Sequence, residues 1–461
     1  MVQKTRPFGI FLALTFGCGL MLALVWGLSS VPHLYAANIT VNTTEDEYNS
    51  DGDCSLREAI AAANNDTAVD ACGPGTGNDV IQFSLSTPAL ITLTQGQLSI
   101  EKDAVTLTGP GVDLLAISGN QASRIFDIAY NIAVTLTGMT VRDGSTSGDG
   151  GGLRSAGPLT LINTTFINNT AGDDGGAIDV QGSLTISSTN ILSNTAAGQG
   201  GGINGFGTTT SLTGGRFEDN RAGSFAGGVY ANGSLVVTGT QFISNAAQTY
   251  VGAVWAWKDA TITNATFTQN RANNNNIGAM YVREDLLMTA SSFISNTAGQ
   301  KIGAALGGND VHITGGVFSG NVAAAGRAGA LDVSGGLWIT GTHFTGNEAT
   351  GSGAAVVHTG DNGRLINTLF ARNNTNGDGS TIYLAQSGDM ELVHATIVGP
   401  AQPLTSAIAI NAGGSVTVVN SIVSGYTFGL DLVSGTAYED TNLFYQTVPR
   451  QRCRCARRAQ F

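Results

Sequence analysis

An aromatic position that recurs about every 25 residues is the feature that most limits the fold of this 461-residue chain. Twelve positions from residue 141 to residue 422 stand in register, so the period is 281/11, or about 25.5 residues. The column comprises Val141, Phe166, Ile191, Phe217, Phe242, Phe267, Phe293, Phe318, Phe344, Phe370, Ile397 and Ile422. Nine of these are followed three residues later by Asn, namely Asn169, Asn194, Asn220, Asn245, Asn270, Asn296, Asn321, Asn347 and Asn373.

Each repeat also holds short strand-like runs separated by turn residues. The runs SLTI (183–186) and SLVV (234–237) alternate, and GGAI (175–178) and GAL (329–331) mark Gly-rich corners. The spacing of leucine-rich repeats is absent, and propeller blades are longer. Because about 25 residues fit three short strands and three corners, we predict an all-β fold, a parallel β-helix (a solenoid) of about twelve coils.

Such a stack gives each column a physical role. Equivalent residues lie above one another about 4.8 Å apart, so the Phe column should fill the interior and the Asn column should pass amide hydrogen bonds along a corner. Residues 178 and 180 and their equivalents are small and apolar, which predicts that they point inward. The side chains at 179 and 181 and their equivalents should then point outward.

One stretch near the N-terminus has a helical pattern, CSLREAIAAAN at residues 54–64. Ser55 and Glu58 form a capping box, and the apolar residues fall on one face. Because the open end of a solenoid needs a cap, we predict that this helix lies across the first coil. Arg57 and Glu58 have the chemistry of catalytic groups, but a role in bridging the cap fits this setting better.

The segment ITVNTTEDEYNSDGDCSLREAIAAAN, followed by GNDVIQF, strongly resembles the CSLREA-domain module of exported bacterial proteins over about residues 38–83. The resemblance implies that right-handed parallel β-helix repeats follow. The GGA[ILV] and F-x-x-N repeats, over about 150–375, resemble those of chlamydial polymorphic outer membrane proteins, which are surface adhesins with a C-terminal barrel. Only sixteen residues follow Tyr445 here, too few for such a barrel, so we expect no membrane insertion of the mature chain.

The first 37 residues have the pattern of a secretory signal. Lys4 and Arg6 precede an apolar run, and small residues end the segment. The length of the run leaves an uncleaved membrane anchor open as an alternative. Without this segment the net charge is 19 − 33 = −14, which argues against a nucleic-acid partner. We therefore predict a secreted or cell-surface protein with a cap at 38–83 and repeats at 84–448.

The five cysteines lie in three separate regions of the sequence. Cys54 and Cys72 flank the predicted helix, and we expect a disulfide between them, with two free thiols as the alternative. Cys18 leaves with the signal segment. Cys453 and Cys455 lie in the Arg-rich tail 449–461, which has the composition of a frameshifted or truncated end and lacks the ligand spacing of a zinc site.

A group of aromatic residues falls on the outward positions of four consecutive coils, with Asn232 beside it. We predict that this stripe binds a partner, with a glycan as the best fit, because exposed aromatic clusters mark binding surfaces. The alternative is packing of the rings on one another or under a covering loop. The predicted ligand-binding residues are Phe206, Tyr230, Trp255, Trp257, Tyr281 and Arg283.

The sequence offers little for catalysis. Asp179 and Asp332 share an outward column but lie six coils apart, and Asp143, Asp149, Asp173 and Asp174 read as turn residues. The loop Asp51–Asp53, near Glu45, Asp46 and Glu47, is either a calcium site or a solvated acidic loop. We therefore expect a non-catalytic surface protein without a cofactor. A polysaccharide-active enzyme, pectate-lyase-like or a glycoside hydrolase, is the alternative, and the oligomeric state stays open.

Overall fold

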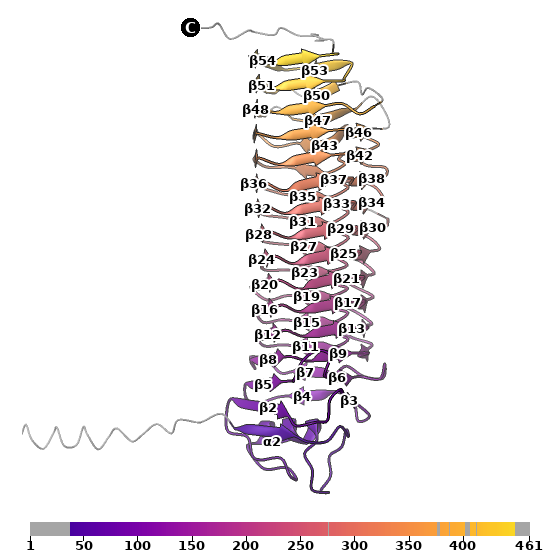
Figure 1. Cartoon of the computed structure of the whole chain (residues 1–461), viewed down its shortest axis with the longest axis vertical. Coiled ribbons are helices and arrows are strands. Elements are labelled where there is room, and N and C mark those ends of the chain that lie inside the picture. Colours follow the sequence, from indigo (N-terminus) through magenta and orange to yellow (C-terminus); the bar gives the residue numbers. More distant parts are fainter. Residues whose placement is uncertain are drawn as a thin grey trace, which may run out of the picture.

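The computed structural model describes residues 37–447, apart from residues 275, 376–378, 387, 402–405 and 412. The chain winds into a single rod of stacked coils with the only helix of the described residues at one end (Figure 1). Strands pair in parallel with their equivalents in the next coil throughout the four sheets. The predicted parallel β-helix is thus confirmed. Residues 1–36 of the predicted signal segment (1–37) and the tail 449–461, with Cys18, Cys453 and Cys455, lie outside the described residues.

Three long sheets form the walls of the rod. A 16-stranded sheet runs from β1 (Asn38–Val41) to β54 (Thr436–Asp440), and a 15-stranded sheet runs from β3 (Ala89–Thr92) to β55 (Leu443–Tyr445). A 14-stranded sheet runs from β4 (Leu98–Ile100) to β53 (Phe428–Leu432). The stack is longer than the Phe column suggested, because the coils before residue 141 carry aliphatic residues at that position.

A fourth, narrow sheet was not predicted. Its ten strands have two residues each and run from β10 (Ser145–Thr146) to β46 (Asn374–Thr375). One full coil therefore contains four strands, as in β23 (Val229–Ala231), β24 (Ser234–Thr238), β25 (Gln241–Ile243) and β26 (Ala246–Ala247). The tight corners between them need left-handed backbone, which Gly239 provides at φ 65°.

The Phe column fills the interior as predicted. Consecutive rings from Phe217 to Phe370 stack with centroids 4.5 to 5.0 Å apart, and all of them are buried. The prediction for Ile422 is wrong by one residue. Val423 pairs with Ile397 and is buried, whereas the side chain of Ile422 is 44% exposed. The neighbouring Asn column is buried along its whole length and forms the predicted ladder of amide hydrogen bonds.

The N-terminal cap also follows the prediction. Helix α2 (Leu56–Asn65) begins with a complete capping box of Ser55 and Glu58, and it packs on β1, β2 (Asp79–Phe83) and β4. A disulfide joins Cys54 and Cys72 across a Cα–Cα distance of 4.9 Å. Helix α2, the only helix of the described residues, is too short and too polar to span a bilayer.

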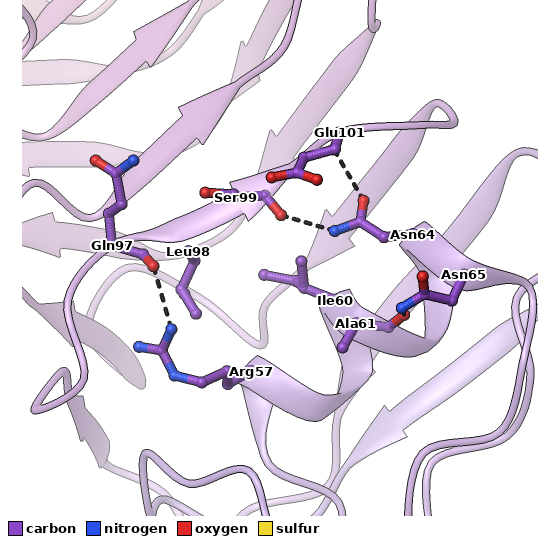
Figure 2. A pocket seen from close by; sticks show the side chains of 9 residues that line it. All are labelled: Arg57, Ile60, Ala61, Asn64, Asn65, Gln97, Leu98, Ser99 and Glu101. Atoms are coloured by element: carbon purple, nitrogen blue, oxygen red, sulfur yellow. Dashed lines mark hydrogen bonds between the residues drawn. The ribbon is translucent and has the colours of Figure 1, made fainter.

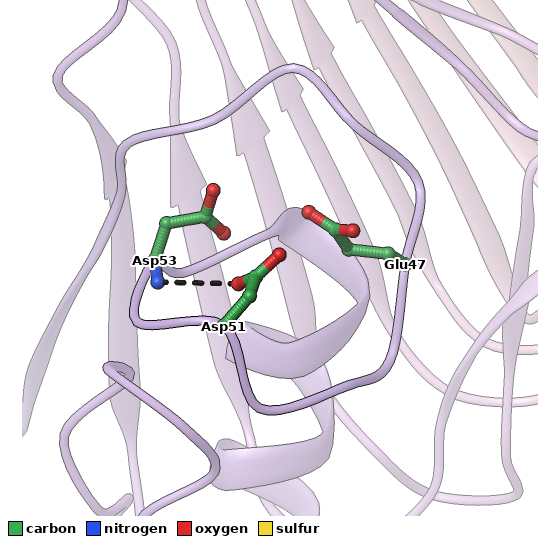
Figure 3. Close-up of side chains that lie close together, drawn as sticks. All are labelled: Glu47, Asp51 and Asp53. Atoms are coloured by element: carbon green, nitrogen blue, oxygen red, sulfur yellow. Dashed lines mark hydrogen bonds between the residues drawn. The ribbon is translucent and has the colours of Figure 1, made fainter.

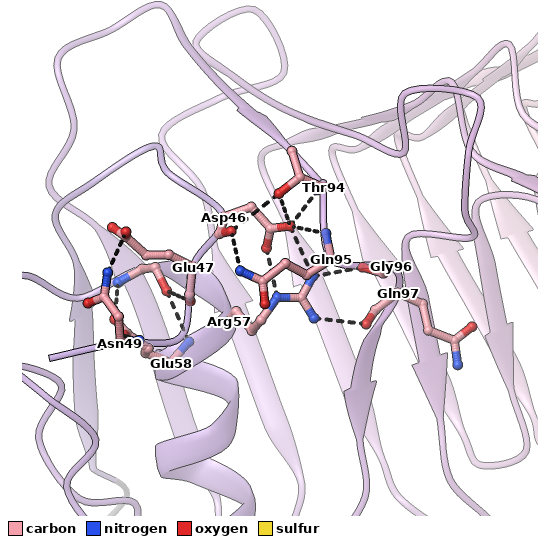
Figure 4. A network of polar contacts seen from close by, with 10 residues as sticks. Asp46, Glu47, Asn49, Arg57, Glu58, Thr94, Gln95, Gly96 and Gln97 are labelled. Carbon is pink, nitrogen blue, oxygen red and sulfur yellow. Dashed lines mark hydrogen bonds and ion pairs between the residues drawn. The ribbon is translucent and has the colours of Figure 1, made fainter.

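Arg57 links the helix to the first coils (Figure 4). Its Nε lies 2.8 Å from Oδ1 of the buried Asp46, and its Nη atoms donate to the carbonyls of Gly96 and Gln97. Asp46 also accepts from the backbone N–H of Gln95 at 2.9 Å. Burial alone would raise the pKa of Asp46, but these hydrogen bonds hold it below its ordinary value. The arrangement supports the structural reading of Arg57.

Candidate functional site

The outward column of the 14-stranded sheet lies outside the core, as the register predicted. Asp179, Asn204, Tyr230, Trp255 and Tyr281 pair with one another in consecutive coils. Their neighbours on either side along each strand are buried in the core. Sequence register alone therefore placed this column on the correct side of the sheet.

A second apolar cluster covers part of this column. Val251, Ile277, Ile302 and Ala328 form a ladder of parallel bridges just before the strands of the 14-stranded sheet. These residues are buried together with Val357, and Trp255 and Tyr281 pack against them. This cluster was not predicted, because its residues precede the strands in Gly-rich corners. It gives the outward column a packed flank.

Seven rings gather beside this flank, and we call them the aromatic cluster. The shortest centroid distances are 4.2 Å between Phe225 and Tyr250, 4.3 Å between Trp255 and Tyr281, and 4.8 Å between Phe225 and Trp255. Tyr230 connects the cluster to Phe206 at 6.1 Å. The cluster consists of Phe206, Phe225, Tyr230, Tyr250, Trp255, Trp257 and Tyr281.

The expectation that all the predicted rings are exposed is wrong. Tyr230 is only 6% exposed, because Phe206, Phe225 and Trp255 surround its ring. Trp255, Trp257 and Tyr281 are half-buried, and Phe206 is 43% exposed. The cluster therefore has a packed base and an accessible rim.

Polar groups lie at this rim. The exposed Arg283 places its guanidinium carbon 4.7 Å from the centroid of the Trp257 ring, a cation–π geometry. Trp257 donates its Nε1–H to the hydroxyl of Tyr230. Burial raises the pKa of Tyr230 and of Tyr281, so both hydroxyls stay protonated at neutral pH. The buried Nε1 atom of Trp255 has no hydrogen-bond partner among the described residues.

Phe225 and Tyr250 were missed in the sequence. They stand four residues before the inward Val229 and Val254, a position that no single residue type marks along the repeats. In the structure this position forms a separate column. Its backbone carbonyls, those of Asp174, Gln199 and Phe225, accept hydrogen bonds from the preceding coil, from Gly150, Gly175 and Gly200 respectively. Comparing this position between repeats would have found both rings.

The same column carries an acidic cluster nearer the N-terminus. One carboxylate oxygen each of Asp149, Asp173 and Asp174 lies within 4.8 Å of the others. The residues do lie in turns, as predicted, but nothing in the sequence indicated that their carboxylates come together. Asp179, in the adjacent outward column, is buried, and burial raises its pKa to about 7. Asp332 occupies the same outward column six strands away and pairs with Arg327.

A second group of carboxylates lies in the cap (Figure 3). Glu47, Asp51 and Asp53 each bring one oxygen within 4.8 Å of the others, whereas Asp46 turns to Arg57. Partial desolvation and the neighbouring negative charges raise the pKa of Glu47 and of Asp53. The loop thus has the composition that the sequence suggested for calcium, with the solvated acidic loop still the alternative.

A small pocket lies between helix α2 and strand β4 (Figure 2). Its volume is about 240 Å³, below the usual range for ligand pockets. Its polar groups already pair across it. Asn64 donates to the carbonyl of Ser99 at 2.8 Å and accepts from the backbone N–H of Glu101 at 2.8 Å. We regard this pocket as part of the joint between cap and rod.

Comparison with known proteins gives little further information. No protein-family description and no curated protein matches the sequence. Among solved structures, the chain is similar to the catalytic unit of a thermostable GH87 alpha-1,3-glucanase from Streptomyces thermodiastaticus strain HF3-3. The match has a TM-score of 0.34 and 14% identity, and it covers 89% of this chain and 68% of that one. We draw no functional conclusion from a likeness at this level.

Proposed function

We propose that this protein is an exported β-helix that binds a glycan on the rim of the aromatic cluster. The observation that carries the proposal is the contact of seven rings outside the core, with Phe206 exposed and Arg283 over Trp257. Flat half-buried rings beside polar side chains suit stacking against the apolar faces of sugars. Arg283 and Asn232, both exposed, supply hydrogen bonds for the hydroxyl groups.

Export is the second part of the proposal. The pattern of the first 37 residues supports it, and a disulfide between Cys54 and Cys72 fits an oxidising compartment. Mass spectrometry of the secreted product, without reductant, should show a mature N-terminus near Asn38 and no alkylatable thiol at positions 54 and 72. An intact residue 1 would support the membrane anchor instead, and two alkylated thiols would exclude the bridge from the secreted form.

Binding is tested with the purified mature chain on a panel of polysaccharides, followed by calorimetry on any that bind. Trp257→Ala and Phe206→Ala should each weaken binding about tenfold, because a stacked ring contributes on the order of 1 kcal/mol. Trp338→Ala is the matched control. Trp338 is also half-buried, but it stacks on His312 in the 16-stranded sheet. Equal losses in all three variants, or no binding to any polysaccharide, would refute the proposal.

A second candidate function is cleavage of a polysaccharide, and the acidic cluster favours it. Asp174 lies two coils from Phe225, roughly 10 Å by strand spacing, so one oligosaccharide can touch both. Glycoside hydrolysis generally needs two carboxyl groups. The wild-type protein should then release oligosaccharides from a polymer that it binds, and Asp173→Asn should bind without releasing them. Prolonged incubation that leaves the bound polymer intact would exclude this candidate.

A further inference from the structure

The rim of the aromatic cluster belongs to a column of residues that runs along the rod, and we call it the rim column. Each member is the first residue after one of five consecutive strands of the 14-stranded sheet, which stack above one another (Figure 1). The strands are β15 (Ile178–Val180), β19 (Ile203–Gly205), β23, β27 (Val254–Ala256) and β31 (Met280–Val282). The rim column consists of Gln181, Phe206, Asn232, Trp257 and Arg283.

The backbone fixes the spacing of the rim column. The N–H of Phe206 donates to the carbonyl of Val180 at 2.8 Å, and that of Trp257 donates to the carbonyl of Ala231 at 2.9 Å. The other three members make the equivalent hydrogen bond to the preceding coil. Neighbouring members are therefore one coil apart, about 4.8 Å, and the whole column spans roughly 19 Å.

Rings and polar side chains alternate along this column. Its rings are Phe206, which is exposed, and Trp257, which is half-buried, whereas the other three members are polar and exposed. The buried Tyr230 supports both rings, because its own ring lies 6.1 Å from that of Phe206 and its hydroxyl accepts from Nε1 of Trp257. The two rings therefore repeat after two coils, or roughly 10 Å.

The corner next to the rim column leaves room for an extended chain. The residues that follow its first three members are Gly182, Gly207 and Gly233. A Cβ atom at Gly207 would lie 1.8 Å from the carbonyl oxygen of Gly182, so the close stacking of these corners requires glycine. In the next two coils Lys258 and Glu284 follow, and they pair with each other at 2.7 Å. A polymer can therefore lie along the column without meeting a bulky side chain at its first three coils.

The charges around the rim column favour a neutral polymer. Asp173 and Asp174 lie in the coil of β15, and Oδ2 of Asp174 lies 3.5 Å from Nδ2 of Asn204, two residues before Phe206. Arg283, at the opposite end, is the single charged member of the column. A chain of acidic sugars would meet one cation and be repelled by the carboxylates at the other end.

We propose that the rim column binds a neutral, extended polysaccharide of β-1,4-linked pyranose sugars, which runs parallel to the rod with one sugar at each coil. In such a chain each sugar is turned over relative to the next, so every second sugar presents the same face to the protein. The rings of Phe206 and Trp257, two coils apart, match that repeat, and the polar members meet the hydroxyl groups of the sugars between them. This inference rests on the glycan binding proposed above and specifies the linkage and the direction of the glycan.

The test is calorimetric titration of the purified mature chain with oligosaccharides of defined linkage and length. A β-1,4-linked pentamer of glucose should bind at least about tenfold more tightly than β-1,3-linked or α-1,4-linked glucose pentamers, whose chains wind and cannot stack on both rings. The β-1,4-linked disaccharide reaches one ring only, so it should bind at least about tenfold more weakly than the pentamer.

A variant tests whether one chain contacts both rings. Phe206→Ala should weaken binding of the β-1,4-linked pentamer about tenfold and change that of the disaccharide little, because the disaccharide can still stack on Trp257. Trp338→Ala, in the 16-stranded sheet, is the control and should leave both affinities unchanged.

The outcomes separate this inference from the proposal on which it rests. If a β-1,3-linked or α-1,4-linked pentamer binds as tightly as the β-1,4-linked one, and Phe206→Ala weakens that binding, the linkage is wrong although the rim does bind glycans. Equal affinities of the wild type for the β-1,4-linked pentamer and disaccharide would overturn the direction along the rod. If no oligosaccharide and no polysaccharide binds, both proposals fail.

Discussion

Oδ1 of Asn270 accepts two hydrogen bonds from Asn245, one from its backbone N–H at 3.0 Å and one from its Nδ2 at 3.1 Å. Asn270 passes the same pair on to Asn296, and its Nδ2 also donates to the carbonyl of Phe242 at 2.9 Å. Each amide in the ladder is therefore an acceptor for one coil and a donor for the next. Removing one side chain leaves buried groups without partners on both sides.

We predict that Asn270→Ala lowers the free energy of unfolding by about 3 kcal/mol, since each buried polar group left unpaired costs about 1–3 kcal/mol. Asn273→Ala, three residues away, is the control. Its exposed side chain makes a hydrogen bond to Gln248, so the loss should stay within about 0.5 kcal/mol. Denaturant unfolding followed by circular dichroism measures both. Similar losses in the two variants would show that the ladder does not stabilise the rod.

The cap should depend on Arg57. Its partner Asp46 has a side chain only 1% exposed, and breaking a buried ion pair costs about 3–5 kcal/mol. We expect Arg57→Ala to lose about 3 kcal/mol, and Arg57→Lys to recover only part of it, because Lys cannot reproduce the two-pronged contact. Arg142→Ala, which breaks an exposed pair with Asp143, should cost below about 1 kcal/mol. An Arg57→Ala variant as stable as Arg142→Ala would contradict this role.

Stability and binding should separate within the aromatic cluster. Trp255 contacts Phe225, Tyr250 and Tyr281 at its packed base, so Trp255→Ala should destabilise the protein by about 3 kcal/mol. Phe206 is 43% exposed, so Phe206→Ala should weaken glycan binding and change Tm little. Scanning calorimetry beside the binding measurements gives both quantities. If Phe206→Ala loses as much Tm as Trp255→Ala, the whole cluster is packing.

His358 should make the rod sensitive to acid. It occupies an interior column between Val333 and Leu384, with Nε2 2.9 Å from the carbonyl oxygen of Gly335. Burial lowers its pKa, although the contact with Gly335 acts in the opposite direction. In the unfolded chain the pKa is about 6.5, so above this pH the ring is neutral in both states. Below pH 6.5 the unfolded state takes up a proton that the folded state resists. The free energy of unfolding therefore decreases as the pH is lowered.

The predicted change is measured by unfolding at pH 7.5 and pH 5. Wild type should lose more stability between these values than His358→Gln, whose amide can still donate to Gly335. The difference is limited to about 1.4 kcal/mol for each pH unit below 6.5. His343→Gln is the control, because His343 is exposed. Parallel losses in wild type and His358→Gln would contradict the assignment.

The features of this fold that repeat in every coil were predictable from the sequence. The contacts between side chains of different columns were not. Phe267 and Asn270 recur with their period, so register alone placed Phe267 in the interior and Asn270 in a hydrogen-bonded ladder along a corner, and the structure has both buried. The same register put Trp255 outside the core but gave no sign that Tyr250 covers it. Contacts between different columns depend on how sharply each Gly-rich corner turns, which the spacing does not specify.

The carboxylates were missed for the same reason. Asp149 and Asp174 share a column, but the residues of that column are acidic in the earlier coils and aromatic at Phe225 and in the coil after it. No single residue type therefore marks the column in the sequence. The cap was more predictable, because the signals of Ser55, Glu58 and the flanking cysteines are local in sequence. The bidentate ion pair of Arg57 with Asp46 was not predictable, because it depends on how the first coils pack against the helix.

The Asn ladder also restricts how the gene can change in length. A deletion of one whole coil, such as the 25 residues from Gln241 to Ala265, brings Thr266 to the position that Gln241 occupied beside Arg216. Asn220 would then meet Asn270 and the ladder would close again. A deletion at this point that does not remove a whole number of coils puts a different side chain beside Asn220 and leaves the amide unpaired. Rod length in the descendants of such a gene should therefore vary in steps of one coil.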